Sequence, residues 1–147
     1  MDYVYIEKFL SGTKIGITIS MKVVAITNNI ELIEIIQNLK EEFQIDLTSI
    51  NKINDSLDVV STICAAPPAF LIFDDDLKQN ESVKILQSIR KLCKNISIIF
   101  ITSDSSIEKG REVAPLGIQY YGVRPVTEEI IAEAMKSIKK FKDNILN

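Results

Sequence analysis

The sequence predicts an α/β protein with one doubly wound parallel sheet of five strands. From Met21 onward, five short apolar runs alternate with segments in which apolar residues recur every three or four positions, the spacing of one helix face. Most of the runs are continuously hydrophobic, which is typical of parallel strands covered by helices on both faces. Right-handed crossovers leave few topologies for five such units. We therefore expect a flavodoxin-like (βα)5 domain over residues 21–147, with strand order 2-1-3-4-5.

The composition indicates one globular domain and excludes several classes of function. The chain has 147 residues, 46% hydrophobic and 25% charged, with a net charge of −3; such a chain buries a core and is not disordered. It contains no His, which rules out Ser-His-Asp and Cys-His catalysis and any His-based zinc site. The sequence pI of about 5.1 argues against a nucleic-acid partner. No apolar run approaches the ~18 residues of a membrane span, so we expect no membrane partner.

The two cysteines, Cys64 and Cys93, lie far apart in the chain within apolar helical patterns. Isolated thiols of this kind are typical of reduced core residues in a cytoplasmic protein, and that is the location we expect. A disulfide between them is the less favoured alternative.

Residues 1–20 precede the repeating pattern and are expected to form a short N-terminal β extension. Apolar and aromatic residues alternate on either side of Ser11-Gly12, as in a β-hairpin; they are Tyr3, Tyr5, Ile15, Ile17 and Ile19. We expect an extension without a separate function. The alternative is an extra hairpin at a sheet edge or in a dimer contact.

The five strands are expected at 22–26, 44–50, 69–73, 96–101 and 118–123. The first helix follows Thr27, Asn28 and Asn29, any of which can cap it. Its apolar stripe runs without interruption from Leu32 to Phe43, which predicts one continuous helix.

The second helix is expected to begin at Asn54 or Asp55 and to end at the Pro67-Pro68 pair, because proline cannot continue a helix. Its core-facing residues are expected to be Leu57, Val60 and Ile63. The third helix is marked by Val83, Leu86, Ile89 and Cys93.

The fourth helix is expected to be short. It begins near Ser106, contains the weak helix former Gly110 and stops near Pro115. Thr127 is expected to cap the last helix, which has acidic residues in its first turn and lysines toward its end. That order of charges is the one that the helix dipole favours.

Polar residues follow the strands at the edge where a site is expected. In open α/β sheets the site lies beyond the carboxyl ends of the strands. Asp74 comes directly after the third strand, while Thr102 and Arg124 end the fourth and fifth. A carboxylate there can attack phosphorus, and a hydroxyl and a guanidinium can hold phosphoryl oxygens. The alternative is that Asp74–Asp76 are simply a solvated loop.

In the order and spacing of these residues, the chain resembles the receiver domain of bacterial response regulators over residues 21–142. The segments that carry the resemblance are PAFLIFDDDLKQNESVKILQSIRK, IIFITS and YYGVRPV. The resemblance implies that Asp74 occupies the phosphoacceptor position, with Thr102 and Tyr121 as the switch residues. It also implies two-component signalling, with a histidine kinase or other signalling protein as partner. The partner or homodimer surface would be the fourth helix, fifth strand and last helix.

The chain departs from the family at the residues that bind Mg²⁺. The family's acid pair after the first strand matches Thr27 and Asn28, and neutral oxygens do not supply the charge that attracts this ion. We therefore expect Asp74, Asp75 and Asp76 to form a weak Mg²⁺ site at most. Like-charge repulsion without a metal is expected to raise the pKa of at least one of these aspartates.

A second departure is Arg124, which stands where the family has an invariant Lys before Pro. Arginine keeps the positive charge, but its planar head cannot take the position of a Lys ammonium. One hypothesis is that a permanent Arg124–Asp74 ion pair mimics the activated state.

These departures favour a pseudo-receiver that signals by protein contact, without phosphorylation at Asp74. The alternative is a functional receiver that takes a phosphoryl group on Asp74 from a histidine kinase. A nucleotide or small-molecule binder is the weakest candidate, because ITNNIE after the first strand has no glycines to form a phosphate-binding loop. We expect no enzyme activity beyond self-phosphorylation and autodephosphorylation.

Overall fold

Five parallel strands form one sheet in the order β4-β3-β5-β6-β7 in the computed structural model, which describes residues 5–10, 13–18 and 20–146. This is the 2-1-3-4-5 order predicted from the sequence, counted from Met21. The strands are β3 (Met21–Ile26), β4 (Ile45–Ile50), β5 (Phe70–Asp74), β6 (Ser97–Thr102) and β7 (Tyr120–Val123).

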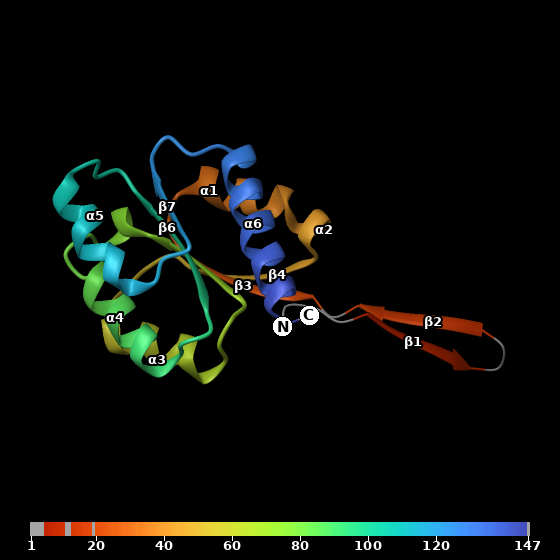
Figure 1. Cartoon of the computed structure of the whole chain (residues 1–147). Helices are drawn as coiled ribbons and strands as arrows, with labels where there is room; N and C mark the ends of the chain where they lie inside the picture. Colours follow the sequence, from red (N-terminus) through yellow and green to blue (C-terminus); the bar gives the residue numbers. More distant parts are fainter. Residues whose placement is uncertain (1–4, 11–12, 19, 147) are drawn as a thin grey trace.

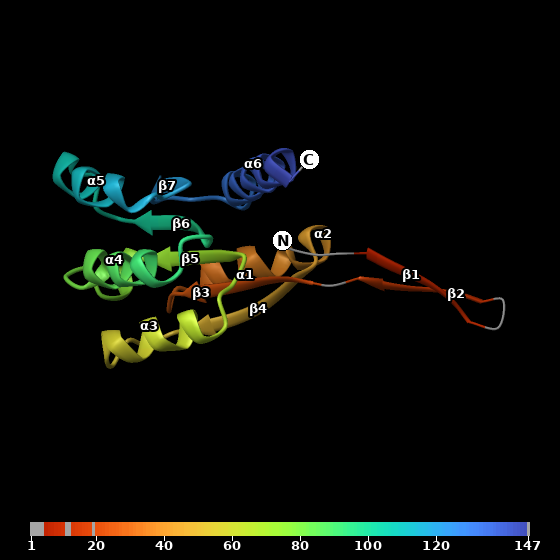
Figure 2. The ribbon, with the colours of Figure 1, turned by 60° about the horizontal axis from the view of Figure 1, so that its bottom comes forward.

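Helices cover both faces of the sheet (Figures 1 and 2). One face packs against α1 (Ile30–Asn38) and α6 (Glu128–Leu146). The other packs against α3 (Ser56–Ala65), α4 (Ser82–Leu92) and α5 (Ile107–Val113). Every residue of β5 and β6 is buried, because successive side chains point into opposite helical layers. This explains why these runs are continuously hydrophobic.

The first predicted helix is interrupted at Leu39. The chain turns there and resumes as the short α2 (Lys40–Phe43), and Gln44 then adopts a left-handed backbone with φ of 53°. The amide of Met21 donates to the carbonyl of Gln44 at 2.8 Å, which anchors this turn to the start of β3. The expectation of one continuous helix was therefore wrong, although Phe43 is buried as its spacing predicts.

Three predicted helix starts are confirmed by their caps. Side-chain oxygens of Asn29, Asp55 and Ser106 accept hydrogen bonds from backbone amides in the first turns of α1, α3 and α5. One core assignment in α3 was wrong, since Leu57 is 70% exposed. The buried stripe of α3 is formed by Val59, Val60 and Ile63, which turns Leu57 in the first turn toward solvent.

The final helix, α6, begins as predicted. The hydroxyl of Thr127 accepts a hydrogen bond from the amide of Ile130 at 3.3 Å, and Ile131 and Met135 are fully buried against the sheet. Neither α6 nor any other helix within the described residues is long and apolar enough to cross a membrane.

The N-terminal strands β1 (Tyr5–Leu10) and β2 (Thr13–Thr18) pair antiparallel, with Tyr5 opposite Thr18, and form a sheet of their own. Both views show this ribbon extending away from the five-stranded sheet (Figures 1 and 2). Tyr3, Ile19 and the expected turn residues Ser11 and Gly12 lie outside the described residues.

Arg90 on α4 ties together segments that meet at the amino-terminal edge of the sheet. Its guanidinium donates to the carbonyls of Leu116 (2.9 Å), Ile96 (2.7 Å), Gly117 (2.9 Å) and Lys94 (3.1 Å). Burial lowers the pKa of Arg90. The acceptors of these four hydrogen bonds are all backbone carbonyl oxygens, which suit the several N–H donors of a guanidinium. The side chain thus fixes the end of α4, the start of β6 and the turn before β7.

We expect Arg90→Met to lower the free energy of unfolding by about 2 kcal/mol, because several partly buried carbonyls lose a charged donor. Urea denaturation measures the change. The matched control is Lys91→Met on the exposed side of the same helical turn, for which a change within about 0.5 kcal/mol is expected. Equal effects of the two substitutions would contradict this role for Arg90.

Candidate functional site

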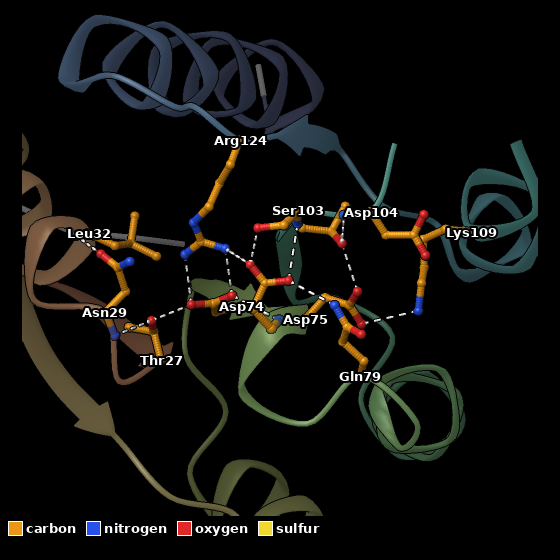
Figure 3. Close-up of polar contacts among 12 residues, drawn as sticks. Thr27, Asn29, Leu32, Asp74, Asp75, Gln79, Ser103, Asp104, Lys109 and Arg124 are labelled. Carbon is orange, nitrogen blue, oxygen red and sulfur yellow. Dashed lines mark hydrogen bonds and ion pairs between the residues drawn. The ribbon is translucent and has the colours of Figure 1, made fainter. Parts of the chain in front are cut away.

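Four polar side chains from separate strands meet at the carboxyl edge of the sheet. Asp74 is the last residue of β5 and Thr102 the last of β6, while Thr27 and Arg124 directly follow β3 and β7. Figure 3 shows Thr27 and Arg124 converging on Asp74 from different elements. The prediction that Asp74, Thr102 and Arg124 lie at the same edge of the sheet is therefore confirmed.

Asp74 is 1% exposed, and both of its carboxylate oxygens are fully engaged. Oδ1 accepts hydrogen bonds from Arg124 Nη1 (2.8 Å) and from the amide of Asp76 (3.0 Å). Oδ2 accepts from Arg124 Nη2 (2.8 Å) and from the hydroxyl of Thr27 (2.6 Å). A carboxylate offers about four acceptor positions, so these four donors use all of them.

Arg124 forms the centre of the site. Its two terminal nitrogens bind Asp74 side by side, and Nη1 also reaches Asp76 Oδ2 at 2.6 Å. The hydrogen bonds to Asp74 raise the pKa of Arg124 against the opposing effect of burial, and the charges of Asp74 and Asp76 add to the increase. The peptide bond from Arg124 to Pro125 is cis.

Asp75 belongs to a second charge pair that the sequence analysis did not anticipate. It is completely buried, with Lys109 Nζ of α5 at 3.3 Å from Oδ1 and the Thr102 hydroxyl donating to Oδ2 at 2.7 Å. Lys109 reaches Asp75 from the side opposite Arg124 (Figure 3). The only signal in the sequence was the spacing of four between Lys109 and the buried Val113, which places both on one helix face.

Thr102 therefore interacts with Asp75 and not with Asp74. Its hydroxyl donates to Asp75 and accepts from the amide of Asp104 at 3.0 Å. Both interactions hold the hydroxyl away from the carboxylate of Asp74.

Asp76 is partly exposed, and its carboxylate accepts hydrogen bonds from several donors. It accepts from the amide of Ser103 at 3.1 Å, from the Ser103 hydroxyl and from Gln79 Nε2 at 3.1 Å. Burial raises the pKa of Asp76, but the bonds from Ser103 and Gln79 and the charge of Arg124 outweigh it, so the pKa lies below the ordinary value of 3.8. Asp76 is therefore not an aspartate of the three with a raised pKa, because donors and Arg124 surround its carboxylate.

The remaining predicted positions flank this cluster. Asn28 is exposed. The ring of Tyr121 stacks on Phe100 with centroids 5.5 Å apart, on the side of the sheet covered by α3, α4 and α5. Its hydroxyl is buried without a hydrogen-bond partner. Burial raises the pKa of Tyr121, as do the charges of Asp104 and Asp75.

The arrangement does not suit a divalent cation. A guanidinium sits between Asp74 and Asp76, and Asp75 points to Lys109, so the three carboxylates do not converge on one point. Within the part of the chain that the structure describes, no group of three His, Cys, Asp or Glu side chains could hold a metal ion. Arg124 and Lys109 supply the positive charge at this edge instead.

Arg124 also separates Asp74 from the neighbouring cleft. The cleft has a volume of about 310 Å³ and lies between α1 and the segment that leads into α6; its walls include Asn29, Leu32, Arg124 and Val126. Asp74 is not among its lining residues. A molecule that entered the cleft would meet the guanidinium before the carboxylate.

Solved structures resemble this fold although the sequences have diverged. No protein-family model and no curated protein matches the chain. The chemotaxis response regulator CheY4 of Vibrio cholerae is 16% identical, with a TM-score of 0.66 over 80% of this chain and 98% of that one. A signal receiver domain of a two-component histidine kinase from Clostridium thermocellum is 13% identical, with a TM-score of 0.71 over 82% and 98%. A CheY-like receiver domain from Methanospirillum hungatei JF-1 is 15% identical, with a TM-score of 0.70 over 84% and 98%.

The chain has the fold of a response regulator receiver domain. In this receiver fold the edge that carries Asp74, Thr102 and Arg124 is the carboxyl edge of the sheet, where ligand sites of open α/β sheets lie.

We expect Arg124→Met to lower the free energy of unfolding by about 3 kcal/mol, because it leaves the buried Asp74 carboxylate without its counter-charge. Adding Asp74→Asn should recover part of the loss. Urea denaturation of the single and double variants measures both effects. The control is Lys78→Met, which removes the half-buried pair with Glu81 and should cost about 1 kcal/mol or less. If Arg124→Met costs no more than this control, the ion pair does not stabilise the fold.

The lowered pKa of Asp76 predicts acid sensitivity. Its contribution to stability is fully present above the ordinary pKa of 3.8 and is lost as pH falls through the lower pKa of the folded state. Denaturation between neutral pH and about pH 2.5 should therefore show a fall in stability below 3.8 that is shallower in Asp76→Asn. Asp58→Asn on the exposed side of α3 is the control and should keep the original slope. An unchanged slope in Asp76→Asn would count against the assignment.

Proposed function

We propose that this chain is a signalling domain of the receiver fold that acts through protein contacts, without phosphorylation at Asp74. The observation that supports the proposal is the complete occupation of the Asp74 carboxylate by Arg124, Thr27 and the amide of Asp76.

A nucleophilic carboxylate needs a free lone pair and a path to phosphorus. Asp74 has neither, because four donors bind its oxygens and the guanidinium lies between it and the cleft. Attack on a phosphodonor would require the loss of a bidentate ion pair at a site that is almost entirely buried. Such pairs are the strongest of the ordinary hydrogen bonds.

The positive charge at the site is permanent. In a receiver, by resemblance, a phosphoryl group at the Asp74 position changes the charge of the edge and moves the residues at the Thr102 and Tyr121 positions. Here the charge of Asp74 is balanced by Arg124, and Thr102 is held by Asp75 and Lys109. We infer that the domain is fixed in one signalling state.

The partner surface that we propose is formed by α5, β7 and α6. Apolar side chains are exposed there, with Ile107 at 69% and Val123 at 37%. A shallow groove of about 520 Å³ is lined by Tyr120 of β7 and by α6 residues that include Ile130 and Ala134. A histidine kinase or another signalling protein is the proposed partner, and a homodimer through the same surface is the alternative. No catalytic reaction is part of the proposal.

A phosphorylatable receiver is the second candidate. The cleft beside Arg124 favours it, because rotation of the guanidinium into that space would free one acceptor position on each oxygen of Asp74. Binding of a kinase or a phosphodonor would then have to supply the energy for this movement.

Incubation with acetyl phosphate and Mg²⁺ followed by intact-mass measurement separates the two candidates. We expect no phosphoryl adduct on the native chain. The variant Thr27→Asp, Asn28→Asp, Arg124→Lys restores the family's residues at these positions and is expected to gain one phosphoryl group.

Two controls make this experiment decisive. Adding Asp74→Ala to the restored variant should abolish the adduct, which assigns it to that carboxylate. An adduct on the native chain that is lost in Asp74→Ala would refute the phosphorylation-independent function. Circular dichroism shows whether each variant is folded.

A further inference from the structure

Tertiary folding brings together the two cysteines, Cys64 and Cys93, which are 29 positions apart in the chain. Cys64 lies in the last turn of α3 and Cys93 caps the end of α4, and these two helices pack against each other. Both side chains are half-buried at the margin of the same core cluster, and the neighbouring Cys93 helps to raise the pKa of the Cys64 thiol. The two cysteines therefore lie at the same end of neighbouring helices, where half-burial leaves them within reach of a small oxidant.

Backbone anchors hold both cysteines in place. Lys22 Nζ donates to the carbonyl of Ala66 at 2.9 Å, which fixes the end of α3. The amide of Cys93 donates to the carbonyl of Ile89 at 2.7 Å. Arg90 holds the residues that follow Cys93. The thiols are thus positioned by polar contacts that do not involve sulfur.

The pair lies far from the aspartate cluster. In a (βα) unit the helix runs back along the sheet, so the ends of α3 and α4 lie at the amino edge, opposite the edge that carries Asp74. The cysteines are therefore not part of the charge network of Asp74, Asp75 and Asp76.

We propose that Cys64 and Cys93 form a reversible dithiol–disulfide site that hydrogen peroxide oxidises. One thiolate attacks a peroxide oxygen, the O–O bond breaks, and a sulfenic acid and water form. The second sulfur then attacks the sulfenic sulfur, the S–O bond breaks, and a second water leaves. Two thiols are oxidised to one disulfide and one peroxide is reduced to two waters.

The surroundings of Cys64 disfavour its thiolate form. Burial is the largest cause and the neighbouring Cys93 adds to it, which raises the pKa of Cys64 to about 11. The Cys64 thiolate is therefore scarce near neutral pH.

Oxidation would act on the segment that carries the aspartates. The loop closed by a Cys64–Cys93 bond contains β5, Asp74–Asp76 and α4. Closing a loop of this length restricts the unfolded chain. The bond would also fasten α3 to α4 on one face of the sheet.

Peroxide treatment of the full chain tests the proposal by intact mass and by peptide mapping without reductant. We expect a loss of two hydrogens, one linked peptide pair that contains Cys64 and Cys93, and full reversal by dithiothreitol. Cys64→Ser and Cys93→Ser, each shown to be folded by circular dichroism, should not lose the two hydrogens. Oxygen adducts alone, or disulfide-linked dimers of the native chain, would overturn the proposal.

Thermal unfolding provides the second measurement. If the bond fits the native packing of α3 on α4, the oxidised chain should unfold about 5–10 °C above the reduced chain, and the Cys64→Ser variant should not respond to peroxide. A lower midpoint after oxidation would show that the native fold does not accommodate the bond, and it would also overturn the proposal.

Discussion

The bidentate ion pair between Arg124 and Asp74 is the interaction on which the rest of the site depends. An aspartate that is 1% exposed would be unstable as an anion without a partner, because burial removes its hydration. Arg124 supplies the counter-charge and two of the four hydrogen bonds, and Thr27 and the amide of Asp76 supply the others. The same contacts occupy the carboxylate oxygens, and the proposed phosphorylation-independent function rests on this occupation.

The neighbouring Asp75 is also a buried carboxylate that is stabilised by a cation and a hydrogen bond, but its partners are different. Two buried carboxylates in consecutive positions would repel each other strongly, and the fold separates them by turning Asp75 toward Lys109 and Thr102. Asp74 and Asp75 thus each have their own cation, from opposite sides of the β5 end. This separation explains why the carboxylates of three adjacent aspartates do not converge on one point.

The parallel sheet keeps the two ends of the molecule chemically distinct. Its carboxyl edge gathers the charged residues that follow the strands, while its amino edge gathers the helix ends, with Arg90 and the cysteine pair. The continuous apolar strands between them exclude water from both faces.

The sequence alone determined the fold class, the strand order, the helix caps and the edge at which Asp74, Thr102 and Arg124 meet. These follow from local rules, since apolar periodicity, caps and short connections act within a few residues. Tertiary structure decided the choice of partners: Thr102 with Asp75, Lys109 with Asp75, and Cys64 with Cys93. It also decided that Leu57 is exposed. Such pairings join residues from different elements. They depend on side-chain directions and packing, which cannot be predicted from the spacing of residues along the chain.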